Sequence, residues 1–270
     1  MDDRPIGVFD SGLGGLTTVR ELCRLLPEED IVYFGDTGRV PYGSRSRETI
    51  VKYARQDVAF LRTFDLKTIV IACGTVSTTA LDVLAAENPI PVLGVVAPAA
   101  RAAARATRSG SIGLIGTQAS IRSGAYERLI RAENPAARVL AQPCPLFVPL
   151  VENGRFRPGD VVIETVAAEY LAPLKEAGVD TLVLGCTHYP LLEKVIGAYM
   201  GPEVRLINSG AEGARAAADC LRERDALAGP GRGSCRCFVS DRQDDFSRLA
   251  STFLGWDVAQ AVEQVDISQY

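Results

Sequence analysis

The sequence predicts an α/β protein with two similar lobes, each a mainly parallel sheet flanked by helices, with a functional cleft between them. Short aliphatic runs alternate with stretches of helical periodicity, a pattern typical of βαβ units. One segment also occurs twice, because 66–75 (LKTIVIACGT) and 179–187 (VDTLVLGCT) each lead to a cysteine shortly before a threonine. A second pair, 6–11 (IGVFDS) and 112–117 (IGLIGT), has nearly the same separation, which indicates a repeated half-length unit.

Strands are expected where β-branched and aliphatic residues run together. We place them at 6–9, 31–34, 69–72, 92–96, 112–115, 139–140, 182–184 and 204–207. Helical periodicity predicts helices at 16–26, 46–64, 77–87, 98–106, 124–131, 160–175, 190–200 and 210–222. Thr75 or Ser77 is a suitable N-cap for the third of these helices, and Pro190 suits the first turn of the seventh.

The repeat divides the chain into two lobes. The second lobe is expected at 98–207, and the first at 1–97 together with the tail 208–270. The tail is predicted to hold a helix at 208–222, a glycine-rich turn at 229–233, a strand at 237–239 and a helix at 246–254. Because it is too short to bury a core of its own, we expect it to pack onto the first lobe.

The composition is typical of a soluble globular protein, with 270 residues, 47% hydrophobic and 23% charged residues, and a net charge of −4. No basic cluster predicts a nucleic-acid surface, and no apolar run reaches the roughly 18–20 residues of a membrane span. No secretory signal precedes the first strand, and the seven cysteines lack regular spacing. We therefore expect reduced thiols and a cytoplasmic location, without nucleic-acid or membrane partners.

Several residues fall at the carboxyl ends of the predicted strands, where open α/β folds bind their ligands. They are Asp10, Ser11, Cys73, Gly116, Thr117, Cys186 and Thr187. Cys73 and Cys186 hold matching positions in the repeat, and each precedes a helix, whose dipole would lower the pKa of the thiol toward neutrality. Two opposed thiols are the acid and base that inversion of a carbon centre needs.

Other residues near these ends have a plainer explanation when taken alone. The run 10–15 fits the dinucleotide fingerprint poorly, because the third glycine of that motif falls on Thr17, and a tight turn explains its glycines equally well. His188 is the only histidine, and a lone histidine is more often structural than catalytic. Glu152 lies in a turn-rich segment that favours a solvated acid.

No metal site is expected. Cys235 and Cys237 form a C-x-C pair, but zinc would need two further ligands and the chain has one histidine and no second close pair. The remaining cysteines are interpreted as packing residues: Cys23, Cys144 and Cys220. P-loop, G-x-S-x-G and H-E-x-x-H motifs are absent from the sequence.

Together these motifs closely resemble those of the glutamate racemases, in the aspartate/glutamate racemase superfamily. The matching stretches are 9–15 (FDSGLGG), 35–43 (GDTGRVPYG), 73–75 (CGT), 115–117 (IGT), 123–126 (SGAY), 151–152 (VE) and 184–190 (LGCTHYP). At position 74 the family more often has asparagine. Gly74 has no side chain and offers the substrate only a backbone contact. The resemblance implies a cofactor-independent isomerase with its active site between two α/β lobes, which interconverts L- and D-glutamate and supplies the D-isomer for peptidoglycan.

The resemblance also implies roles for individual residues. Cys73 and Cys186 would be the two bases, assisted by Asp10 and His188 respectively, with Glu152 as a further catalytic acid. The substrate-binding positions would be Asp10, Ser11, Pro41, Tyr42, Gly43, Gly74, Thr75, Thr117, Thr187 and His188. Hydroxyls, backbone N–H groups and helix N-termini would hold two carboxylates and stabilise a carbanion.

Alternatives stay open within and outside this class. The first alternative is an aspartate racemase. A binding cavity one methylene shorter would discriminate between aspartate and glutamate by only about 1–3 kcal/mol. Some relatives are thought to bind DNA gyrase, although nothing in the sequence marks such a surface, and a thiol–disulfide enzyme would need the C-x-x-C motif that is missing. The resemblance implies a homodimer acting on a small molecule. Regulation by a cell-wall precursor, which goes with longer N-termini, is not expected.

Overall fold

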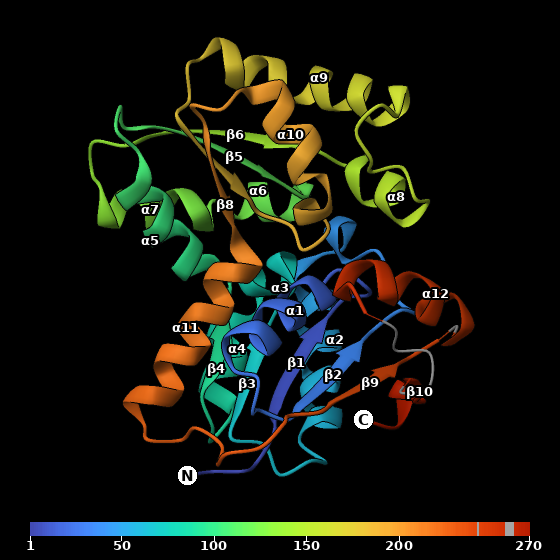
Figure 1. Cartoon of the computed structure of the whole chain (residues 1–270). Helices are drawn as coiled ribbons and strands as arrows, with labels where there is room; N and C mark the ends of the chain where they lie inside the picture. The colour runs from blue at the N-terminus through green and yellow to red at the C-terminus, as the bar shows by residue number, and fades with distance from the viewer. Residues whose placement is uncertain (242, 257–261) are drawn as a thin grey trace.

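The computed structural model describes residues 1–241, 243–256 and 262–270. It contains two parallel sheets, one in each half of Figure 1. The lower sheet has the order β10-β9-β2-β1-β3-β4. Its strands are β1 (Ile6–Asp10), β2 (Ile31–Gly35), β3 (Thr68–Ile71), β4 (Val92–Gly94), β9 (Cys235–Val239) and β10 (Val262–Gln264). The predicted fold class is therefore confirmed.

The upper sheet repeats the topology of the lower one. Its strands are β5 (Ser111–Gly116), β6 (Arg138–Pro143), β7 (Thr181–Leu184) and β8 (Arg205–Asn208). Their order, β6-β5-β7-β8, matches β2-β1-β3-β4 strand for strand. The two repeated segments of the sequence thus form neighbouring strands at equivalent places in the two sheets, β1 and β3 in one and β5 and β7 in the other. Corresponding strand ends carry Cys73 and Cys186.

The helices cover both faces of the sheets (Figure 1). They are α1 (Leu16–Leu25), α2 (Arg47–Leu61), α3 (Gly74–Thr79), α4 (Leu81–Glu87), α5 (Val96–Ala106), α6 (Gln118–Ser123), α7 (Ala125–Glu133), α8 (Phe147–Glu152), α9 (Val161–Glu176), α10 (Glu193–Met200), α11 (Ser209–Glu223) and α12 (Gln243–Leu254). The described residues also form the 3₁₀ helices η1 (Tyr42–Ser44), η2 (Tyr189–Leu192) and η3 (Ile267–Gln269).

The structure differs from the predicted elements in five places. The helix predicted at 77–87 is two helices, because Ala80 leaves the helical conformation between α3 and α4. The helix predicted at 190–200 begins as the 3₁₀ turn η2. Helices α6 and α8 and strand β10 were not predicted, because each is only three to six residues long and a short run carries little periodicity.

The tail returns to the first sheet. β9 pairs in parallel with β2, with Ile31 opposite Cys235, and β10 extends the sheet beyond β9. Helix α11, which is at the left of the lower half of Figure 1, packs against α1. The lobe boundaries at 97/98 and 207/208 remain a prediction.

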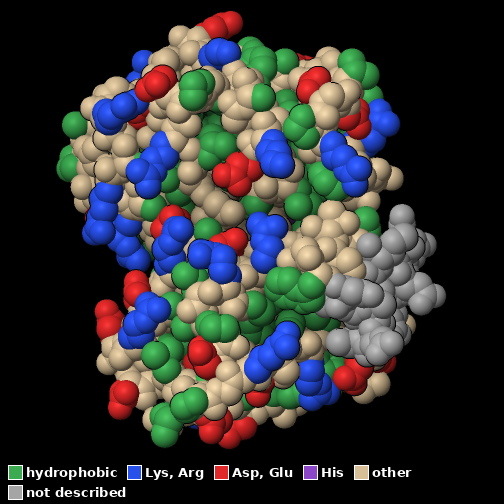
Figure 2. All heavy atoms as spheres, in the orientation of Figure 1, with side chains coloured by type: hydrophobic (Ala, Val, Ile, Leu, Met, Phe, Trp, Pro, Cys, Tyr) green, Lys and Arg blue, Asp and Glu red, His purple; other side chains and the backbone are tan. Residues whose placement is uncertain are grey.

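The surface carries both basic and acidic side chains. Figure 2 shows basic and acidic side chains interspersed over the two halves of one face. Within the described residues, no helix is both long and apolar enough to cross a lipid bilayer.

Candidate active site

A cavity of about 390 Å³ lies between the strand ends of the two sheets. Its volume is within the usual range of small-molecule sites. Among the described residues, its lining includes every predicted site residue except Asp10. These are Ser11, Pro41, Tyr42, Gly43, Cys73, Gly74, Thr75, Thr117, Glu152, Cys186, Thr187 and His188. The cavity thus brings residues from both halves of the repeat together.

Cys73 stands at the end of β3 as the residue before α3, and is almost fully buried. Its thiol donates a hydrogen bond to the Ser11 hydroxyl, with 3.5 Å between Sγ and Oγ. Burial, followed by the negative charge of Asp10, raises the pKa of Cys73 to about 12. The expectation that the helix dipole lowers this pKa is therefore wrong: desolvation outweighs a helix of six residues. Cys73 is a neutral thiol at pH 7.

Asp10 lies beneath the cavity rather than in its wall. Its carboxylate is completely buried and accepts hydrogen bonds from the Gly12 N–H at 3.0 Å and the Thr187 hydroxyl at 3.3 Å. Burial raises the pKa of Asp10, while the charge of His188 and these hydrogen bonds lower it in part. Asp10 affects Cys73 through its charge, since its own hydrogen bonds are directed to Gly12 and Thr187.

Cys186, His188 and Glu152 form a chain of side chains. His188 Nδ1 lies 3.9 Å from the Cys186 sulfur, and its Nε2 lies 3.0 Å from Glu152 Oε1. The ring is buried edge-on against Phe253 of α12, with 5.5 Å between centroids. Burial works against a charged imidazole, but the contacts with Cys186 and Glu152 outweigh it and raise the pKa of His188 to about 10. His188 therefore carries a positive charge at neutral pH, and this charge lies next to the Cys186 sulfur.

Hydroxyl groups from both lobes meet on another side of the cavity. The Oγ1 atoms of Thr75 and Thr117 are 3.0 Å apart, although one follows β3 and the other follows β5. Thr117 is also the N-cap of α6, where its hydroxyl accepts a hydrogen bond from the Ser120 N–H at 3.2 Å. These hydroxyls and the start of α6 form an arrangement suited to binding a carboxylate.

The Tyr42 hydroxyl does not face the cavity. Tyr42 is buried, and its hydroxyl donates to Asp36 behind the loop, with Asp57 Oδ2 3.1 Å away. Only its ring and backbone can contact a ligand. Its two neighbours Pro41 and Gly43 line the cavity as well.

At Gly74 the backbones of the two halves of the repeat lie close together. A Cβ atom on Gly74 would lie 2.6 Å from the backbone oxygen of Gly185, the residue before Cys186. Such a distance is too short for any side chain, and a backbone oxygen cannot move aside alone. The glycine found in place of the family's usual asparagine thus corresponds to a tight backbone contact across the cleft.

The cavity also contains residues that the sequence analysis did not select. They are Gly12, Val40, Ser44, Gln118, Cys144, Pro145, Val148, Pro149 and Gly185. Four of them come from the segment around α8, which was interpreted as turn-rich. The spacing of Phe147 and Val151, both buried and four residues apart, was the available signal of a helix. This helix places Glu152 beside His188, with the Glu152 side chain 33% exposed.

Metal ligands do not gather in the described part of the chain: no group of three or more His, Cys, Asp or Glu side chains there could hold an ion. The sulfurs of Cys235 and Cys237 are 3.9 Å apart on β9, away from the cavity.

Cys73 and Cys186 line one cavity, and comparison with known proteins identifies the class of protein as an amino-acid racemase. The family model described as Asp/Glu/hydantoin racemase matches residues 9–217, and the chain belongs to this family of isomerases.

Its relatives are glutamate racemases. The chain is 49% identical over 256 residues to the glutamate racemase of Geobacter metallireducens, which covers 94% of both chains. It is 46% identical to that of Chlorobaculum tepidum over 258 residues, or 95% of this chain and 94% of the relative. The structure of a Bacillus anthracis glutamate racemase superposes with a TM-score of 0.93 at 38% identity, covering 98% of each chain. That of Francisella tularensis, a complex with D-glutamate, gives 0.92 at 37% identity over 100% of both chains.

Proposed function

We propose that this racemase interconverts L- and D-glutamate by a cofactor-independent, two-thiol proton transfer between Cys73 and Cys186. The observation that carries the proposal is that both cysteines, from corresponding strand ends of different sheets, line one cavity. A ligand between them would present opposite faces of its α-carbon to the two sulfurs. Inversion requires this geometry, because one proton leaves as another arrives from the other side.

In this mechanism a thiolate takes the α-proton, and the electron pair of the broken C–H bond stays on the substrate as a carbanion. The opposite thiol then donates its own proton to the other face and becomes the thiolate. The carbanion is stabilised by hydrogen-bond donors around the substrate carboxylate, here the Thr75 and Thr117 hydroxyls and backbone N–H groups.

The two cysteines are proposed to have different roles at rest. Cys73 is the proton donor, because burial and Asp10 raise its pKa to about 12. Cys186 is the base, because its sulfur lies 3.9 Å from Nδ1 of His188, which is itself held by Glu152. By resemblance to the family, Cys186 deprotonates L-glutamate and Cys73 deprotonates D-glutamate. The resting protein is therefore ready for the L-to-D direction.

Glutamate is the proposed substrate, and aspartate is the second candidate. Support for glutamate comes from the Francisella relative, described in complex with D-glutamate, and from relatives named as glutamate racemases. We propose that the product supplies D-glutamate for peptidoglycan in the cytoplasm. Circular dichroism of the purified protein with L-glutamate, and separately with L-aspartate, tests the choice without added cofactor. Loss of the glutamate signal alone supports the proposal, and loss of the aspartate signal alone overturns it.

A homodimer is the assembly that the resemblance implies, and sedimentation equilibrium measures it. A supercoiling assay on a Cys73→Ser/Cys186→Ser double variant would separate any inhibition of DNA gyrase from racemisation.

A further inference from the structure

Five consecutive residues, Val40–Ser44, form one wall of the cavity. They belong to the connection between β2 and α2. Within this wall, a Cβ atom on Gly43 would lie 3.0 Å from the Cβ of Thr117 in the other half of the repeat. The position of this loop therefore determines one side of the space that a ligand can occupy.

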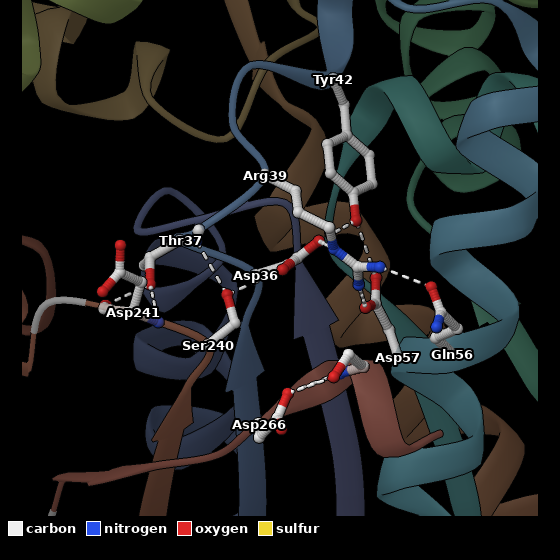
Figure 3. A network of polar contacts seen from close by, with 11 residues as sticks. Asp36, Thr37, Arg39, Tyr42, Gln56, Asp57, Ser240, Asp241 and Asp266 are labelled. Atoms are coloured by element: carbon white, nitrogen blue, oxygen red, sulfur yellow. Dashed lines mark hydrogen bonds and ion pairs between the residues drawn. The ribbon is translucent and has the colours of Figure 1, made fainter.

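A buried cluster of charged side chains lies behind the loop (Figure 3). Arg39 donates from Nε to Asp36 Oδ2 at 2.6 Å, from one terminal nitrogen to Asp57 Oδ1 at 2.8 Å, and from the other to Gln56 Oε1 at 2.6 Å. Its guanidinium carbon lies 4.3 Å from the centroid of the Tyr53 ring. Both aspartates are completely buried, and the Arg39 side chain is 17% exposed. Every arm of the guanidinium is thus in use, in a planar geometry that lysine cannot reproduce.

Tyr42 connects this cluster to the cavity. Tyr42 is part of the wall, whereas its hydroxyl lies between Asp36 and Asp57, as Figure 3 shows. The tail adds a further attachment, because the Ser240 hydroxyl donates to Asp36 Oδ1 at 2.8 Å and accepts from the Gly38 N–H at 2.8 Å. The loop is therefore fixed from α2 on one side and from the end of β9 on the other.

The charges of the cluster indicate a role other than stability. Two buried carboxylates share one guanidinium, and burial together with the charge of Asp36 raises the pKa of Asp57 well above its ordinary value. Burial opposes the charge on Arg39, but the neighbouring Asp57, Tyr42 and Asp36 outweigh it and raise the pKa of the guanidinium. Buried ion pairs often stabilise a fold no better than apolar side chains of similar size. A cluster directly behind a cavity wall can instead fix the geometry of that wall.

We propose that Arg39 and Asp57 are positioning residues of the racemase site, which act through Asp36 and Tyr42 to hold Val40–Ser44 as a fixed wall against the bound substrate. This inference rests on the proposed function in so far as glutamate occupies the cavity. It concerns binding and is independent of which groups transfer the proton. A wall that contacts substrate equally before and during reaction affects KM and leaves kcat nearly unchanged.

Four variants test the proposal: Arg39→Met, Arg39→Lys, Asp57→Asn and Ser240→Ala. The readouts are KM and kcat from circular dichroism and the dissociation constant of D-glutamate from calorimetry. We expect Arg39→Met to raise KM and the dissociation constant roughly tenfold, with kcat within about threefold of the parent, as expected for lost uniform binding. Arg39→Lys should restore little of this. Asp57→Asn and Ser240→Ala should have smaller effects, since the first keeps an uncharged hydrogen-bonding side chain and the second removes one attachment.

Lys67→Met is the matched control. Lys67 forms a buried ion pair with Glu29 in the same half of the molecule, and neither residue lines the cavity. This variant should lower the free energy of unfolding and leave KM unchanged. If Arg39→Met behaves in the same way, the inference is overturned. Should Arg39→Met not fold, Ser240→Ala carries the test, and an unchanged KM and dissociation constant there would overturn it.

The proposed function fails on different evidence. Racemisation that survives in a Cys73→Ser variant would overturn the two-thiol mechanism without affecting the binding result for Arg39. If the parent and all four variants at Arg39, Asp57 and Ser240 bind glutamate equally well, the positioning role is overturned. The two-thiol mechanism is not affected by that result.

Discussion

The hydroxyl of Thr187 donates a hydrogen bond to the buried carboxylate of Asp10, with 3.3 Å between the oxygens. Asp10 ends β1 in one sheet, and Thr187 follows β7 in the other. The Thr17 hydroxyl lies 2.9 Å from the Thr187 carbonyl and adds a second contact at the same junction. The two halves of the site are therefore joined beneath the cavity, and the environment of each thiol includes groups from the opposite half.

Cys73→Ser and Cys186→Ser should each abolish net racemisation of glutamate, because a serine hydroxyl is far too weak an acid to replace a thiol at neutral pH. Circular dichroism measures the rate in both directions. Each variant should still bind D-glutamate in calorimetry, since the threonine hydroxyls and backbone groups remain. Substantial racemisation by either variant would exclude the two-thiol assignment.

Replacing Asp10 or His188 with asparagine should slow turnover by roughly 10²–10⁴, the usual contribution of a positioned acid or base partner. The two enantiomers are equally stable, so kcat/KM must fall equally in both directions. Any asymmetry must be measured from deuterium isotope effects at the α-carbon. His188→Asn should enlarge the effect for L-glutamate, whose proton goes to Cys186, and Asp10→Asn the effect for D-glutamate. Small and equal changes in the two isotope effects would show that neither residue assists proton transfer.

The strands formed by the repeated segments, and the positions of the two cysteines at strand ends, could be predicted from the sequence. Both depend on the local residue pattern and on the repeat. Runs of β-branched residues define β1, β3, β5 and β7, and the carboxyl ends of parallel strands meet at one edge. The same logic located Ser11, Thr117 and Thr187 at the cavity without any knowledge of packing.

The direction of individual side chains could not be predicted in this way. Tyr42 lines the cavity and remains a predicted substrate-binding residue, but its hydroxyl is directed to Asp36 and Asp57, and this contact depends on the tertiary position of α2. The pKa of Cys73 was expected to fall, but burial raises it, and burial is a property of the assembled lobes. Glu152 reaches His188 only because the short helix α8 packs against the segment that follows β7.

The contribution of His188 to stability should depend on pH in one direction. The pKa of His188 is raised from 6.5 to about 10 by its contacts with Cys186 and Glu152, against the effect of burial. A raised pKa in the folded state adds stability that is complete below about 6.5 and is lost as the pH rises through about 10. The difference in free energy of unfolding between the parent and His188→Asn, from urea titrations, should therefore be large at pH 6 and shrink toward pH 10. A difference that grows with pH would contradict the imidazolium assignment.

Alkylation should distinguish the two thiols. With a pKa of about 12, Cys73 has almost no thiolate at pH 7, whereas Cys186 lies beside the His188 imidazolium. Because the thiolate is the reactive form, limiting iodoacetamide should modify Cys186 well before Cys73. Peptide mass spectrometry measures both sites in one sample. His188→Asn should slow modification of Cys186 and leave Cys73 unaffected, and faster labelling of Cys73 would reverse the proposed resting states.

Gly74→Asn restores the residue that is more usual in the family and should nevertheless weaken this protein. Its Cβ would lie 2.6 Å from the Gly185 backbone oxygen, so the two halves of the repeat must separate at the point where they carry Cys73 and Cys186. Overpacking of this kind costs about 1–3 kcal/mol, which urea unfolding can measure. We expect kcat/KM for glutamate to fall as well, because the thiols no longer face the α-carbon at the same separation. Gly231→Ala is the control, since a Cβ there meets no atom within 4 Å and its backbone angle φ is not positive. The prediction would be contradicted if Gly74→Asn were as stable as the parent and had a lower KM. The asparagine side chain would then improve substrate binding, and the close contact with Gly185 would not exclude a side chain at this position.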